Sequence, residues 1–170
     1  MHSDVISAGG AFIDEHVETQ ASDYASAFRS RIYPGRSVPD VAGLVGMQPH
    51  VDYIMLPLES GCMLDQDVSE HDGTGPDDGW SVISGTSAAA PQLAGVCALF
   101  KQRNPGLAPA EIREILKRTA RDVTKGHANE ASNSVTVNKQ IRFEPIEAGL
   151  GPDGATGHGI VDAFAAWQQV

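Results

Sequence analysis

The sequence predicts one α/β domain, and three observations lead to this prediction. Short apolar segments with strand character occupy residues 41–45 and 80–84, and segments with helical character occupy 88–101 and 109–120. Strands that alternate with helices in this way are typical of α/β folds. The chain has 170 residues, which is long enough to bury a core without disulfide bonds.

The first part of the chain is expected to form short strands. Residues 4–10 are predicted as a buried strand that runs into a glycine turn. Residues 37–45 and 51–56 are two further apolar stretches, and Pro39 favours an edge or the start of a strand.

Residues 59–79 are predicted to be an acidic surface loop. The segment contains seven acidic residues and no Lys or Arg. Its loop-forming residues are Gly73, Gly75, Pro76 and Gly79. A solvated loop and a functional acidic lip or cation site both remain open, and charge runs are usually solvated. An EF-hand is excluded, because the required Gly and the final Glu are missing after Asp65.

The helix at residues 88–101 is apolar almost all round, which predicts burial in the core. Pro109 opens the next helix. The apolar face of that second helix carries Ile112, Ile115, Leu116 and Ala120. Residues 126–158 are predicted as loop with some strand, and residues 159–169 as a closing helix. This closing helix is expected to pack through Ile160, Val161, Phe164 and Trp167.

Composition restricts the class of partner. The chain carries 12 Lys and Arg against 22 Asp and Glu, a formal net charge of −10. This argues against nucleic acid as a partner, because phosphate binding needs clustered basic residues. No apolar run reaches the roughly 18–20 residues of a membrane helix, so no membrane partner is expected. Cys62 and Cys97 form no disulfide framework, and no signal peptide is visible.

Ser87 is the first candidate for chemistry, because it stands between a predicted strand and a helix N-terminus. Free N–H groups and the helix dipole there favour developing negative charge. Gly85 allows a tight turn beside a substrate backbone. A serine becomes a nucleophile only with a base and a stabilised oxyanion. From these residues alone, an N-cap serine is at least as good an interpretation.

The run from Gly85 to Gly95, Gly-Thr-Ser-Ala-Ala-Ala-Pro-Gln-Leu-Ala-Gly, resembles the nucleophile signature of the subtilase superfamily of serine peptidases. We judge that the likeness covers residues 4–13, 35–58 and 80–170. It implies the C-terminal part of a three-layer fold with a mostly parallel sheet flanked by helices.

The same resemblance implies a serine endopeptidase that acts on polypeptide substrates. It assigns the nucleophile to Ser87, whose backbone N–H would be one oxyanion donor, and it places Gly85 and Thr86 at the substrate cleft. Secretion is usual for the family, so the resemblance also implies an extracellular location.

Two branches of the superfamily fit the sequence, the subtilisin-like and the sedolisin-like. Gly35-Arg36-Ser37-Val38-Pro39-Asp40-Val41-Ala42 resembles a sedolisin segment near the substrate cleft, although turn capping by Asp40 is an equal alternative. Residues 149–153 resemble the sedolisin Gly-x-Gly-x-Asp calcium loop. The implied calcium ligands are the Asp122 and Asp153 carboxylates and the Val123, Gly149 and Gly151 carbonyls. The alternative is two ordinary turn aspartates.

The resemblance is incomplete in its catalytic partners. No Asp-[Ser/Thr]-Gly and no His-Gly-Thr occurs, and the sedolisin Glu and Asp would lie upstream of the matched region. Residues 1–170 are therefore expected to be one partial peptidase domain, its nucleophile-bearing C-terminal half, with the N-terminal half as a partner. The alternative is a noncatalytic, calcium-binding remnant that acts as a binding or structural module.

Overall fold

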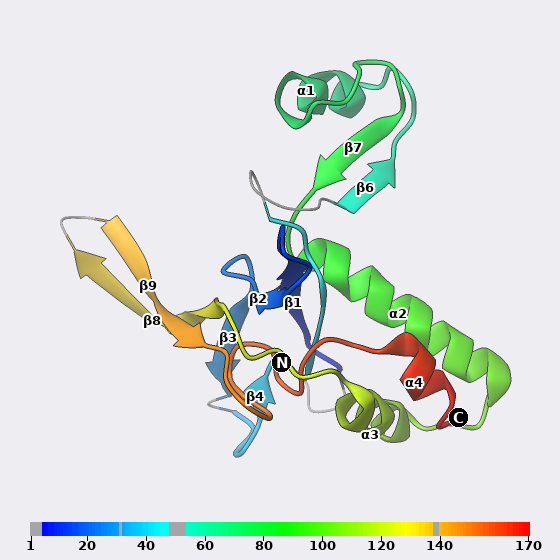
Figure 1. Cartoon of the computed structure of the whole chain (residues 1–170), viewed down its shortest axis with the longest axis vertical. Helices are drawn as coiled ribbons and strands as arrows, with labels where there is room; N and C mark the ends of the chain where they lie inside the picture. The colour runs from blue at the N-terminus through cyan, green and yellow to red at the C-terminus, as the bar shows by residue number, and fades with distance from the viewer. Residues whose placement is uncertain (1–4, 31, 48–53, 138–139) are drawn as a thin grey trace.

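The computed structural model describes residues 5–30, 32–47, 54–137 and 140–170. A main body of two sheets and three helices carries a projecting arm, residues 54–83, at one end of its long axis (Figure 1). No helix in these described ranges is long and apolar enough to cross a bilayer.

The first sheet has the strand order β2-β1-β5. Its strands are β1 (Ala8–Ile13), β2 (Thr19–Ala21) and β5 (Val41–Leu44). β1 pairs antiparallel with β2 and parallel with β5. The expected strand at residues 4–10 is displaced, because Gly9 and Gly10 lie within β1 instead of in a turn. A Cβ at Gly9 would lie 2.6 Å from Pro39 Cγ, so this strand position accepts only glycine.

The second sheet has the strand order β4-β3-β8-β9. Its strands are β3 (Ser26–Arg29), β4 (Ser37–Val38), β8 (His127–Val137) and β9 (Gln140–Glu147). The segment expected to be loop with some strand is thus largely the β8–β9 hairpin. The α/β class is confirmed, but the described pairs are mostly antiparallel, and only β1–β5 and β3–β8 are parallel. Short connections give antiparallel neighbours, since a parallel pair needs a long crossover.

The arm is an antiparallel ribbon of β6 (Ile54–Pro57) and β7 (Trp80–Ile83), with helix α1 (Met63–Asp72) between the strands. The prediction of a loop throughout residues 59–79 is therefore wrong. The Cys62 side chain caps α1 by accepting the Asp65 N–H. The buried Asp65 carboxylate accepts the N–H groups of Gly61 and Gly79, which fixes the start of α1 to the start of β7 at the end of the ribbon away from the main body (Figure 1).

The main body contains α2 (Thr86–Arg103), α3 (Pro109–Thr119) and α4 (Ala163–Trp167). The first two confirm the predicted helices. The predicted closing helix is reduced to the five residues of α4, which Asp162 caps by accepting the Ala165 N–H at 2.8 Å. The expected packing of Phe164 and Trp167 is wrong, because these side chains are 70% and 42% exposed.

The core between the helices and the first sheet joins α2, α3 and α4 to β5. Its buried members include Val41, Leu93, Phe100, Ile112, Ile115, Leu116 and Ala166. The face of α2 away from this core is open, and Leu99 on it is 51% exposed. Burial of α2 all round, as its composition predicted, therefore does not occur in the described structure.

Candidate active site

Ser87 lies in the first turn of α2, and its side chain is exposed. The N-cap is Gly85 at φ +118°, and no side chain caps the helix. The N-cap interpretation of Ser87 is therefore wrong, because the serine is already the second helical residue. Ala88 N–H donates to Gly85 O at 3.0 Å, so the N–H groups of Thr86 and Ser87 precede the first hydrogen bond of the helix. An oxygen anion beside Ser87 would meet these backbone donors and the positive end of the dipole.

The start of α2 is fixed to the carboxyl end of β5. Gly85 N–H donates to Val45 O at 2.8 Å, directly after the last residue of that strand. Open α/β sheets place their sites at this end of the parallel strands. The position of Ser87 therefore follows from the crossover geometry and from the glycine that turns the chain.

A side chain on α2 also locks the helix to β5. The Gln92 amide donates to Leu44 O at 2.8 Å, and its oxygen accepts the Leu44 N–H at 3.1 Å. Sequence reasoning treated Gln92 only as part of the signature. Its role needed the pairing partner, which lies 48 positions away in the chain.

A general base beside Ser87 is not found among the described residues. No hydrogen bond from the Ser87 hydroxyl to a described residue occurs. Among the described histidines, His158 lies beside Asp40, where the His158 backbone N–H donates to the Asp40 backbone carbonyl at 3.0 Å.

Asp122 and Asp153, the two implied carboxylate ligands for calcium, both contact the loop at residues 149–151. Asp122 Oδ2 accepts the Gly151 N–H at 2.9 Å, and Asp153 Oδ2 accepts the Gly149 N–H at 2.7 Å. Asp153 Oδ1 accepts the N–H groups of Ala155 and Thr156 at 2.9 and 2.8 Å. The carboxylates thus face amide donors where an ion would need carbonyl oxygens. The described ranges hold no group of three or more His, Cys, Asp or Glu that could bind a metal. The implied ligands, however, are two carboxylates and three backbone carbonyls, so the calcium site stays a prediction.

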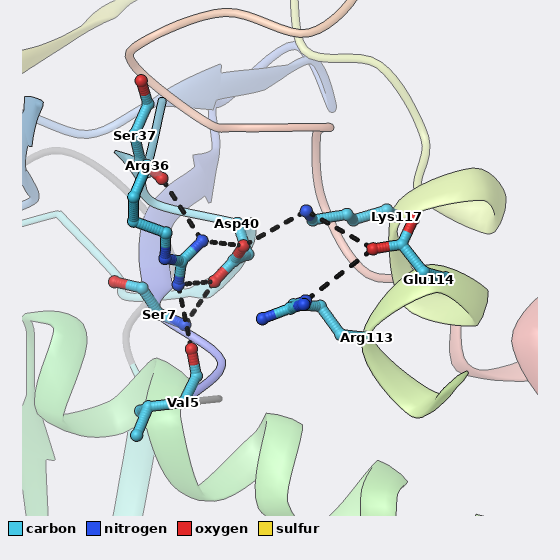
Figure 2. Close-up of polar contacts among 8 residues, drawn as sticks. All are labelled: Val5, Ser7, Arg36, Ser37, Asp40, Arg113, Glu114 and Lys117. Carbon is cyan, nitrogen blue, oxygen red and sulfur yellow. Dashed lines mark hydrogen bonds and ion pairs between the residues drawn. The ribbon is translucent and has the colours of Figure 1, made fainter. Parts of the chain in front are cut away.

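Asp40 lies in a buried ion network at the edge of β5 (Figure 2). Both of its carboxylate oxygens accept hydrogen bonds from the Arg36 guanidinium, Oδ2 accepts the Ser7 N–H at 2.8 Å, and Lys117 Nζ lies 3.4 Å from Oδ1. Burial raises the pKa of this carboxyl, but the hydrogen bonds from Arg36 and Ser7 and the charges of Arg36 and Lys117 outweigh it. The pKa of Asp40 therefore lies below its ordinary value.

The fold and the signature around Ser87 define a subtilase-type domain, and the comparisons with known proteins agree. The sequence model of the subtilase family matches residues 17–141, which is more than half of the chain. The chain therefore belongs to the subtilase family.

Two relatives illustrate the match. The serine protease AprX of Bacillus subtilis is 32% identical over 111 residues, which are 64% of this chain and 23% of AprX. The subtilisin-like protease SBT2.6 of Arabidopsis thaliana is 34% identical over 91 residues, which are 49% of this chain and 11% of that protein. The chain thus spans less than a quarter of the length of these relatives.

The fold also matches solved structures. Fervidolysin from Fervidobacterium pennivorans, a keratinolytic enzyme related to subtilisin, aligns with a TM-score of 0.51 at 20% identity. The alignment covers 97% of this chain and 22% of fervidolysin. At this identity the likeness supports the fold class.

Proposed function

We propose that this chain carries the nucleophile of a serine endopeptidase and that Ser87 is that nucleophile. The observation that carries the proposal is the placement of an exposed Ser87 in the first turn of α2, at the carboxyl end of β5. Family membership supports a polypeptide as substrate. Gly85 and Thr86 would flank the bound peptide backbone.

The proposed reaction begins with attack of Ser87 Oγ on the peptide carbonyl carbon. The carbonyl oxygen becomes an oxyanion and accepts hydrogen bonds from backbone N–H groups of the first turn of α2. The hydroxyl proton passes to a base, which later protonates the leaving amine. We propose that the base and a further oxyanion donor lie on a segment outside residues 5–170, corresponding to the N-terminal half of the catalytic domain. The open face of α2 around Leu99 is available for that segment.

A fluorophosphonate probe tests the nucleophile assignment, because the probe phosphonylates activated serines. We expect mass spectrometry to place the adduct on Ser87 and to find none in Ser87→Ala. Labelling should be slow in the 170-residue chain alone and faster when the N-terminal half of a subtilase domain is supplied. Ser26→Ala, which removes another exposed serine hydroxyl, is the matched control and should label like the wild type.

The outcomes separate this function from the alternative. Equal labelling of the wild type and Ser87→Ala would contradict the nucleophile assignment. A complete lack of labelling in every combination would favour the alternative of a noncatalytic subtilase domain that acts as a binding or structural module.

Calcium binding, the sedolisin-like branch and an extracellular location stay proposals from the sequence resemblance. For calcium, the support is that Asp122 and Asp153 both reach the loop at residues 149–151. An ion there would require the loop to turn carbonyl oxygens toward these carboxylates.

A further inference from the structure

An open cleft lies in the main body, away from the arm. It has a volume of about 1160 Å³ and is bounded by β3, β4, α3 and the loop at residues 152–158. Figure 1 shows these elements at the opposite end of the long axis from α1. Pockets for small ligands measure about 300–1,000 Å³, so this cleft is large enough for a protein segment.

The cleft is basic although the chain is acidic. Arg29, Arg36, Arg113 and Lys117 line it, and its carboxylates are those of Asp40 and Asp153. Arg36 donates two hydrogen bonds to the Asp40 carboxylate, so its positive charge is balanced within the cleft wall. Both oxygens of Asp153 accept hydrogen bonds from its own loop. Four basic side chains against two carboxylates leave the cleft lining with a positive formal charge, and a concave surface concentrates its field.

Glu114 moderates this charge from the rim. Its carboxylate lies 3.7 Å from both Arg113 and Lys117, and its side chain is 62% exposed (Figure 2). The Arg113 and Lys117 side chains are 21% and 20% exposed, so Glu114 is the exposed partner of each pair and the one that another carboxylate can replace. A more favourable acidic partner could therefore replace Glu114 at these two basic side chains.

The arm carries the complementary charge. Its exposed acidic residues are Glu59, Asp67, Glu70, Asp77 and Asp78. The segment from Glu59 to Gly79 contains no Lys or Arg. Because the arm and the cleft lie at opposite ends of the molecule, an arm meets a cleft only on a second copy (Figure 1).

We propose that the arm of one copy docks into the basic cleft of a second copy, in a head-to-tail contact. An α-helix with its side chains is about 10–12 Å wide, which suits an open cleft of this size. The contact is heterologous, so it builds rings if the rotation closes and filaments if it does not. The net charge of −10 opposes association in every orientation, so copies associate only where complementary patches outweigh this repulsion. This proposal does not depend on Ser87.

Sedimentation velocity over a range of protein and salt concentrations tests the contact. We expect association at low salt that is lost at about 1 M salt, where the Debye length is about 3 Å. Association that strengthens with salt would overturn the proposal, because it would point to the open apolar face of α2. A chain that stays monomeric at low salt and high concentration would overturn it as well.

Charge reversal makes the test specific. The arm variant Asp67→Lys/Glu70→Lys and the cleft variant Arg29→Glu/Arg113→Glu should each associate at least about tenfold more weakly than the wild type. A mixture of the two variants should associate again, because the unaltered arm of the cleft variant meets the unaltered cleft of the arm variant, and the lysines of the altered arm meet the glutamates of the altered cleft. Failure of the mixture while both variants remain folded, by circular dichroism, would overturn the proposal.

The matched control is Glu15→Lys/Glu147→Lys. It changes the net charge as much as the arm variant does, at exposed positions outside the arm. This control should keep wild-type association at low salt within about twofold, because it leaves the arm and the cleft unchanged. Loss of association in the control would show that the change in net charge, and not the change in the arm, weakens association in the arm variant.

Discussion

The ion pair of Arg36 and Asp40 has little contact with water, since their side chains are 12% and 1% exposed. A buried pair can be weak in net terms, but removal of one partner leaves the other charge uncompensated. Arg36 also donates to Val5 O, so the pair ties the β4 segment to the chain before β1. Arg36 and Asp40 are four residues apart in the sequence, whereas Ser7 and Lys117 are far from Asp40 in the sequence and reach its carboxylate only in the folded chain.

We predict that Asp40→Asn lowers the free energy of unfolding by about 3–5 kcal/mol, because the Arg36 guanidinium loses its carboxylate. Urea unfolding followed by circular dichroism measures the change. Glu15→Gln is the control, since its exposed carboxylate should contribute less than about 0.5 kcal/mol. An equal effect of the two substitutions would show that the buried pair adds nothing to stability.

The same carboxylate should make stability depend on pH. The pKa of Asp40 is lowered in the folded state, so the stability it contributes is complete above the unfolded value of about 3.9. That contribution is lost as the pH falls through the folded pKa. The acid-induced loss of stability should therefore be shallower in Asp40→Asn than in the wild type, measured by urea midpoints across the acid range.

The contact of α2 with β5 sets the position of Ser87. A Cβ at Gly43 would lie 3.0 Å from Ala89 Cβ and 3.1 Å from Leu93 Cδ1, so a methyl group there would force the helix to shift by a few tenths of an ångström. Close packing of this kind transmits small changes in volume into shifts of whole elements. Because Ser87 lies on α2, the packing of α2 against β5 also sets the position of the proposed nucleophile.

We predict that replacing glycine by alanine has opposite effects on stability at Gly43 of β5 and at Gly95 of α2. Gly43→Ala should destabilise the fold by about 1–3 kcal/mol through overpacking and should slow labelling of Ser87. Gly95→Ala, on an exposed part of α2 with no atom within 4 Å, should stabilise the helix by about 0.5–1 kcal/mol. Thermal unfolding and the labelling rate measure both, and equal signs would contradict the packing argument.

Elements with strong local signals were predictable from the sequence. α2 was predictable from its continuous apolar composition, and α3 from its apolar periodicity and the N-terminal Pro109. α1 was missed because its stability comes from contacts outside the helix, above all Asp65 accepting the Gly79 N–H. The β8–β9 hairpin was only partly anticipated, since strand pairing depends on a partner and polar Asn-rich strands carry little pattern. The serine was found from its signature, but its exposure and its distance from any described base needed the fold.

At the scale of the whole molecule, three segments far apart in sequence are hydrogen-bonded to one another next to the proposed calcium loop: β5, the chain after α3 and the chain before α4. Arg121 and Ile160 exchange backbone hydrogen bonds at 2.9 Å, and Ala42 N–H on β5 donates to Gly159 O at 2.8 Å. The loop at residues 149–157 joins this junction to the β8–β9 hairpin. An ion held by Asp122 and Asp153 would therefore stabilise the whole fold and not the loop alone.

Calcium binding can be tested through the stability of the molecule, because a ligand that binds only the folded state raises the free energy of unfolding. At a calcium concentration about 100 times the Kd the gain is about 2.7 kcal/mol. We predict this gain for the wild type in thermal unfolding against EDTA, and its loss in Asp122→Asn, whose amide oxygen can still accept the Gly151 N–H. Equal unfolding midpoints of the wild type in calcium and in EDTA would mean that the two aspartates serve only the turns in which they stand.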